Sequence, residues 1–252
     1  MKKTLCLVMA AMLLLLCACS KEDMESVQPS PEATAAPTEE PQHSELYLPD
    51  YTLEQVLEYF NEVVLDVEYS DGTGDVSLVQ KWTGPLIYRI YGIPTDEDWA
   101  MLSLLFEQLN RVPGFPGIYA AEPGETENLK IGFFDPEGFT KQFSEMLRGE
   151  DAFGATQFWY YTDTNELYEA QIGYRIDLEQ TVRSSVLLEE IINTIGITDT
   201  TLRTDSIVYQ YSNDNLRLSD MDWLIVKLLY NPAIKCGMDK EACAAVIEQL
   251  YY

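Results

Sequence analysis

Carboxylates are the only abundant side chains in this chain that could do acid–base chemistry. The 252 residues include 42 Asp and Glu but a single His, His43, which lies in a low-complexity stretch. Nucleophile systems of the Ser–His–Asp and Cys–His types need an imidazole base, and a catalytic zinc site needs three protein ligands, most of them His. Both classes of site are therefore excluded. A paired Asp/Glu acid–base site remains open, and the sequence does not single out one pair.

The first 19 residues have the pattern of a secreted lipoprotein leader. Lys2 and Lys3 precede an apolar run of 15 residues, from 5 to 19, which is too short to span a bilayer comfortably. Residues 16–19, Leu-Cys-Ala-Cys, resemble the bacterial lipobox, in which the last cysteine is acylated and becomes the mature N-terminus. This resemblance implies a signal peptide over residues 1–18 and an acylated, palmitate-bearing Cys19. The protein is then held at the cell membrane by its lipid and faces outside the cytoplasm. An ordinary signal peptide or an uncleaved anchor is the alternative.

Residues 19–46 are predicted to be the acylated cysteine followed by a disordered linker. Residues 20–46 carry seven acids, one lysine and four prolines. Such a segment buries too little apolar surface to offset its ordering entropy. The whole chain has a formal net charge of −26, and loss of the two lysines in residues 1–18 makes it −26 − 2 = −28. This charge excludes nucleic acid as a partner, because a phosphate backbone is bound by clustered Lys and Arg.

Residues 47–252 are predicted to form one folded domain, because helical and strand patterns alternate along them. Capping boxes at Thr52 and Ser219 begin two of the helices. The predicted helices cover residues 52–65, 95–110, 137–148, 184–195, 219–230 and 239–250. The predicted strands cover residues 85–92, 129–134, 156–161 and 166–178, with a turn at 163–165 between the last two. This order indicates an α+β fold: a sheet packed by helices, with a helical C-terminal subdomain.

Two sets of aromatic and apolar side chains carry specific expectations. In the helix over 95–110, helical spacing points five side chains inward: Trp99, Leu102, Leu105, Phe106 and Leu109. In the strand over 156–161, Phe158 and Tyr160 lie on one face, and Trp159 and Tyr161 lie on the other. Core packing of this run is favoured over a carbohydrate-binding platform.

Cys236 and Cys243 are the cysteines that remain in the folded domain once the leader is removed and Cys19 is acylated. Outside the cytoplasm, two remaining thiols are predicted to pair as a disulfide, which would close a short loop and stabilise the domain by roughly 2.5 kcal/mol. Two partly buried free thiols near the last helix are the alternative.

Residues 187–222 resemble the active-site region of zincin-type metalloproteases. These enzymes carry H-E-x-x-H-x-x-G on a helix, so that two His at i and i+4 bind zinc beside a general-base Glu. Counted back from Gly196, Glu189 and Asn193 stand at the two His positions and Glu190 at the general base. Asp199 stands where one branch carries a third His, and Val208 where that branch carries the methionine of a turn beneath the metal. The Glu and Gly are kept, and every nitrogen ligand is absent.

The span from residue 47 to 252 is similar to a bacterial family known as the domain of unknown function 2927. The similarity is carried by the Glu189-Glu190 helix and by residues 114–117, 183–186, 205–207, 228–232 and 237–238. The resemblance implies a zincin-like fold that lacks the metal ligands, and it implies no particular activity, because a fold does not determine chemistry.

Three interpretations of the Glu189-Glu190 helix follow. In the first, these side chains are ordinary or internally hydrogen-bonded helix polar groups. In the second, they line a vestigial cleft that binds a peptide or glycan without cleaving it. In the third, Glu189, Glu190, Asn193 and Asp199 hold Ca²⁺ or Mn²⁺, which prefer oxygen ligands, whereas Zn²⁺ would fit poorly.

The expected function is non-catalytic binding, by a membrane-anchored lipoprotein, of a cell-envelope or extracellular protein, peptide or glycan. No catalytic residue, metal or cofactor is assigned. The alternative is a hydrolase that acts on peptide or polysaccharide with carboxylates or an oxygen-liganded cation.

Overall fold

The computed structural model of this protein describes residues 44–65, 78–147 and 152–252. The predicted signal peptide, Cys19, His43 and the linker as far as residue 43 lie outside these ranges. In the described part of the chain, none of the helices has the length and hydropathy needed to cross a membrane.

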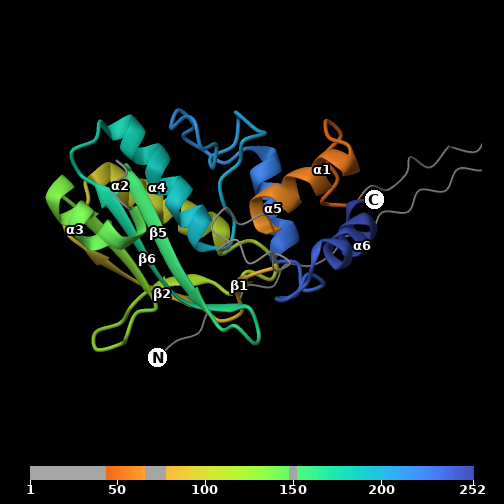
Figure 1. The fold of residues 1–252 in the computed structure, drawn as a ribbon, viewed down its shortest axis with the longest axis horizontal. Coiled ribbons are helices and arrows are strands. Elements are labelled where there is room, and N and C mark those ends of the chain that lie inside the picture. Colours follow the sequence, from red (N-terminus) through yellow and green to blue (C-terminus); the bar gives the residue numbers. More distant parts are fainter. Residues whose placement is uncertain (1–43, 66–77, 148–151) are drawn as a thin grey trace, which may run out of the picture. The chain divides into compact units, whose positions relative to one another are not determined.

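A six-stranded mixed sheet organises the described residues (Figure 1). Its strands are β1 (Lys81–Trp82), β2 (Leu86–Tyr91), β3 (Ile118–Ala120), β4 (Leu129–Phe134), β5 (Gly154–Tyr160) and β6 (Glu166–Arg175). The order β1-β6-β4-β2-β3 is parallel throughout, and β5 pairs with β6 in the antiparallel direction. The four predicted strands are confirmed, and β5 and β6 form the predicted hairpin. Its turn places Asn165 at φ 59°, a conformation that Asn tolerates better than most residues.

Helices α1 to α6 and one π-helix complete the described part. They are α1 (Leu53–Phe60), η1 (Asn61–Leu65), α2 (Asp96–Leu109), α3 (Pro136–Leu147), α4 (Gln180–Thr194), α5 (Asp220–Leu229) and α6 (Lys240–Tyr251). Capping boxes begin α1 at Thr52, α2 at Thr95 and α5 at Ser219. Every predicted helix is confirmed, although α4 begins four residues before the predicted start at residue 184.

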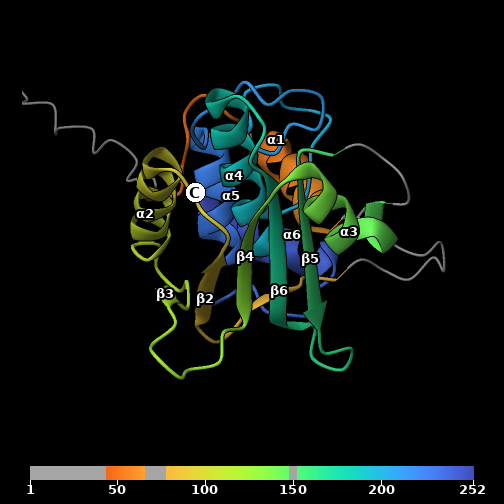
Figure 2. The same cartoon turned by 90° about the vertical axis from the view of Figure 1, so that its left-hand side faces the viewer.

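The two faces of the sheet have different coverings. Helix α4 packs on β5 and β6 from one side, whereas α3 contacts β4 and β6 from the other (Figure 2). Tyr174 of β6 is buried on the α4 side and donates a hydrogen bond to the carbonyl oxygen of Leu187 in α4 at 2.9 Å. Buried residues of α5 and α6 belong to the same hydrophobic core as those of the sheet. The C-terminal helices therefore share their core with the strands.

The inward side of α2 differs from the prediction at Trp99. Its side chain is 42% exposed, and the preceding residue, Asp98, is fully buried. Asp98 accepts a hydrogen bond from the backbone N–H of Thr95 and forms an ion pair with Arg183 of α4. Asp98, as one member of a buried ion pair, occupies the inward position in the first turn of α2. Trp99 therefore lies on the outer side of the helix. The other four side chains predicted inward are buried.

The predicted disulfide between Cys236 and Cys243 is not present, because both cysteines are free thiols. The Cys243 side chain is fully buried in the core. The Cys236 thiol is directed to the carbonyl oxygen of Lys81, 3.6 Å away. Burial raises the pKa of both thiols, which favours the protonated, unreactive form.

Tyr251, at the end of α6, forms hydrogen bonds with residues 44–51, the N-terminal segment of the described domain. Its buried hydroxyl donates to the carbonyl oxygen of Tyr51 at 2.7 Å and lies 2.9 Å from that of Leu48. The carbonyl oxygen of Tyr251 accepts a hydrogen bond from Ser44 Oγ at 3.1 Å. Residue 44, which the sequence assigned to the linker, thus contacts the domain.

Candidate functional site

Helix α4 places the Glu189, Glu190 and Asn193 side chains along one segment, as the sequence predicts. The helix ends at Thr194, and Gly196, two residues later, has a φ of 96°, which favours glycine. A Cβ at this position would lie 2.4 Å from the carbonyl oxygen of Gln80, so the end of the helix approaches the neighbouring backbone too closely for any other residue. This close approach explains physically why glycine stands there.

Glu190 is directed into the protein toward strand β5. Its side chain is 7% exposed, and Thr156 Oγ1 donates a hydrogen bond to Glu190 Oε2 at 2.6 Å. A Cβ on Gly154 would lie only 2.4 Å from Glu190 Oε1. Glycine at the start of β5 therefore makes the space in which this carboxyl group lies. The Glu190 carboxyl is a buried contact between helix and sheet.

Glu189 and Asn193 are held by the segment that follows the helix. Asn213 Nδ2 donates to Glu189 Oε2 at 2.8 Å, and Asn193 Nδ2 donates to Asp199 Oδ1 at 3.2 Å. All three of these predicted residues are half-buried. The four predicted site residues are thus brought into one region, each with a hydrogen-bond partner from the protein.

Residues 206–208, which the zincin resemblance places in the turn beneath the metal, are hydrogen-bonded to α5. Asp222, itself buried, accepts hydrogen bonds from Ser206 Oγ at 2.7 Å, from the Ile207 backbone N–H at 3.0 Å and from the Tyr59 hydroxyl at 2.8 Å. Val208, which stands at the methionine position of the resemblance, is fully buried in the core. The turn is therefore held by a hydrogen-bonded carboxylate.

Burial changes the acidity of the two glutamates. It raises the pKa of Glu190 well above the ordinary value of 4.5, the charge of Asp199 adds to the increase, and the hydrogen bond from Thr156 offsets part of it. Burial likewise raises the pKa of Glu189, with further contributions from Glu190 and Asp199. Three acids in a partly dehydrated region disfavour one another's charged forms, so protonation of the glutamates is favoured.

The arrangement does not resemble a cation site. Among residues 44–65, 78–147 and 152–252, no group of three or more His, Cys, Asp or Glu side chains is placed so that it could hold a metal ion.

The hydrogen-bond partners of the two glutamates, Thr156 and Asn213, come from segments that carry no signal in the sequence for this role. Sequence spacing on α4 located the acids, but it could not show what they contact.

Comparison with protein families places the described domain in a known family. A family model described as "Protein of unknown function (DUF2927)" matches residues 53–249, which covers nearly all of the described domain. No curated protein matches the chain.

Proposed function

We propose a function for this chain as a member of DUF2927, the family to which it belongs. The chain is a lipoprotein tethered through Cys19 to the outer side of a cell membrane. Its domain is a zincin-like α+β domain with a helical C-terminal part, and it binds a cell-envelope or extracellular partner without cleaving it. The apolar leader that ends in Leu-Cys-Ala-Cys supports the tether.

One observation carries the non-catalytic part of the proposal. The residue at the general-base position, Glu190, is buried, hydrogen-bonded to Thr156 and fitted against Gly154. A general base must reach the proton that it removes, either directly or through one water molecule. A carboxyl group enclosed between α4 and β5 does not meet that requirement, so its role is to join the helix to the sheet.

The alternative is a hydrolase that uses carboxylates or an oxygen-liganded cation. The raised pKa of Glu189 and Glu190 favours it, because perturbed acids cluster at catalytic sites. The hydrogen bonds of these side chains argue against it, since Thr156 and Asn213 each already occupy one carboxylate oxygen that a substrate or cation would need.

Elemental analysis and cleavage assays on the full chain in detergent separate the two functions. We expect no stoichiometric metal, no cleavage of casein, and no release of fragments from isolated bacterial envelopes. The proposal is wrong if the protein retains stoichiometric zinc and cleaves casein, with both lost in Glu190→Ala. Release of envelope fragments that is lost in Glu189→Ala or Glu190→Ala, but kept in the exposed control Glu241→Ala, would establish the hydrolase.

The tether has a test of its own. In bacteria fed radiolabelled palmitate, Cys19→Ser is expected to abolish labelling of the protein, because the lipid is attached through the thiol sulfur, which serine lacks. The matched control Cys6→Ser, elsewhere in the leader, is expected to stay labelled and in the membrane fraction. Continued labelling of Cys19→Ser would rule out Cys19 as the lipidated residue.

A further inference from the structure

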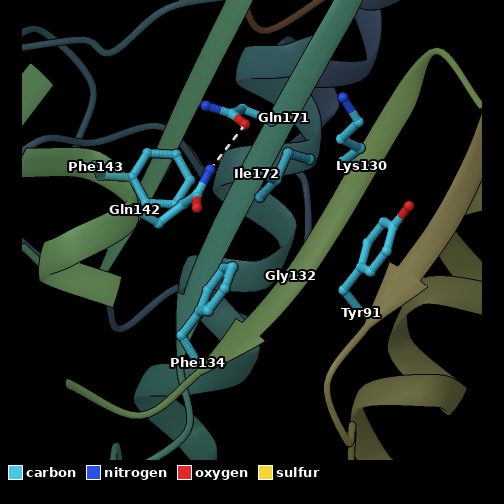
Figure 3. Close-up of a pocket in the computed structure, with 8 residues that line it drawn as sticks. All are labelled: Tyr91, Lys130, Gly132, Phe134, Gln142, Phe143, Gln171 and Ile172. Atoms are coloured by element: carbon cyan, nitrogen blue, oxygen red, sulfur yellow. Dashed lines mark hydrogen bonds between the residues drawn. The ribbon is translucent and has the colours of Figure 1, made fainter. Parts of the chain in front are cut away.

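The sheet face opposite α4 carries a pocket that the α4 acids do not line. The pocket has a volume of about 350 Å³ and lies where β2, β4 and β6 meet α3 (Figure 3). In Figure 2 this face of the sheet is turned toward the viewer, with α3 in front of part of it. The volume falls within the range of small-molecule sites in proteins.

Two glycines make the apolar end of the pocket. A Cβ on Gly132 of β4 would lie 2.2 Å from the Phe134 ring, and a Cβ on Gly173 of β6 would lie 2.2 Å from the Phe143 ring. The rings therefore lie directly against the strand backbone. Phe134 and Phe143 pack edge to face, with their centroids 6.2 Å apart. Together they form an aromatic wall where α3 meets the sheet.

Amide side chains form the polar side of the pocket. Gln142 of α3 donates to Gln171 of β6 at 3.3 Å (Figure 3). Gln171 in turn donates to Gln157 of β5 at 2.8 Å. Each amide group offers both donors and an acceptor, so the row retains hydrogen-bonding capacity for a ligand. Lys130, beside it on β4, pairs with Glu169 at 3.0 Å.

Tyr91 stands at the opposite edge of the pocket, at the end of β2. Its ring is 42% exposed, and its hydroxyl donates to Glu127 Oε1 at 2.5 Å. Arg89 donates to the other oxygen of Glu127 at 3.0 Å. These hydrogen bonds hold the exposed Tyr91 ring in one orientation. Less side-chain conformational entropy is therefore lost when a ligand stacks on the ring.

We infer that this pocket binds a neutral oligosaccharide, which deepens the proposed function by naming its partner. Aromatic rings accept the C–H faces of a pyranose, and amides bond its hydroxyl groups. The charges at the pocket are already paired, Lys130 with Glu169 and Arg89 with Glu127, so neither an anion nor a cation finds an unpaired counter-charge among these residues.

An extended peptide fits this face less well. Peptides that add to a sheet use the free backbone groups of an edge strand. The strands beneath this pocket are internal, since β4 pairs with β2 and β6, and β6 pairs with β4 and β5. Recognition here must use side chains, and those side chains are the aromatic and amide groups that suit a sugar.

Titration of the full chain in detergent with neutral tetrasaccharides of glucose and of N-acetylglucosamine tests the inference. At least one is expected to bind, and Tyr91→Ala and Gln142→Ala are each expected to weaken that binding at least tenfold. Both side chains are exposed, so the fold should survive, which circular dichroism checks. The matched control Tyr211→Ala, at an exposed tyrosine in another segment, should bind as the wild type does.

Three results would overturn the inference: no binding of either tetrasaccharide at millimolar concentration, equal binding by Tyr91→Ala and Tyr211→Ala, or binding of a neutral tetrapeptide in their place. The first and third leave the proposed non-catalytic function intact. Analysis of the sugar recovered after binding separates failure of the inference from failure of the proposed function. Cleavage of a bound tetrasaccharide would contradict the proposed non-catalytic function, but it would support the inference that the pocket binds a sugar.

Discussion

Asp98→Ala is expected to lower the free energy of unfolding by about 3–5 kcal/mol, as for other broken buried ion pairs. The Asp98 side chain is fully buried, and that of its partner Arg183 is 6% exposed. Removal of the carboxylate leaves a guanidinium with no counter-charge inside the protein. It also removes the acceptor for the Thr95 backbone N–H at the start of α2. Urea unfolding of the full chain at neutral pH measures the loss.

Two further variants isolate the cause. Glu107→Ala breaks an exposed pair between α2 and Arg111, just beyond the end of that helix, and should change stability by at most about 0.5 kcal/mol. The double variant Asp98→Leu with Arg183→Met should be more stable than Asp98→Ala, because no unpaired charge stays buried. The explanation fails if Asp98→Ala costs no more than Glu107→Ala.

Glu190→Gln is expected to stabilise the protein at alkaline pH, by about 2–4 kcal/mol, since one pKa unit corresponds to about 1.4 kcal/mol. The folded-state pKa of Glu190 is raised above its ordinary value of 4.5 by burial. Stability from such a group is fully present below the unfolded-state pKa and is lost as pH rises through the folded-state pKa. Glutamine stays neutral and can still accept the hydrogen bond from Thr156, so the variant escapes this loss.

Urea unfolding at a series of pH values from about 4 to about 9 tests this expectation, because that range spans the shift. The difference between Glu190→Gln and the wild type should be small or negative at the acidic end and should grow steadily with pH. Glu241→Gln, on the exposed surface of α6, should show no such trend. A difference that does not change with pH would mean that Glu190 is charged in the folded protein throughout.

The elements of this fold were predictable because their signals are local. The capping box of Thr52 and Gln55 lies within four residues, and so does that of Ser219 and Asp222. The hairpin of β5 and β6 follows from two strand patterns and one short turn. Strands β1 and β3, of two and three residues, were missed because so short a run has no periodicity to detect.

The contacts of the candidate site were not predictable, because they join distant segments. Glu190 and Thr156 are 34 residues apart, and Asp98 and Arg183 are 85 apart. The exposure of Trp99 depends on that second pair. The free state of Cys243 depends on which side of α6 packs into the core. Spacing along one helix cannot reveal any of these partners.

The attachment of Tyr251 to the N-terminal segment has a mechanical consequence. Tension that enters the domain at Ser44 meets the hydrogen bonds to Tyr251 before it reaches any strand of the sheet. These bonds lie beside the contact between the tilted rings of Tyr47 and Tyr251, whose centroids are 5.4 Å apart. If the domain is pulled through the proposed tether, these contacts of Tyr251 are therefore expected to break first, while the sheet and its pocket stay intact.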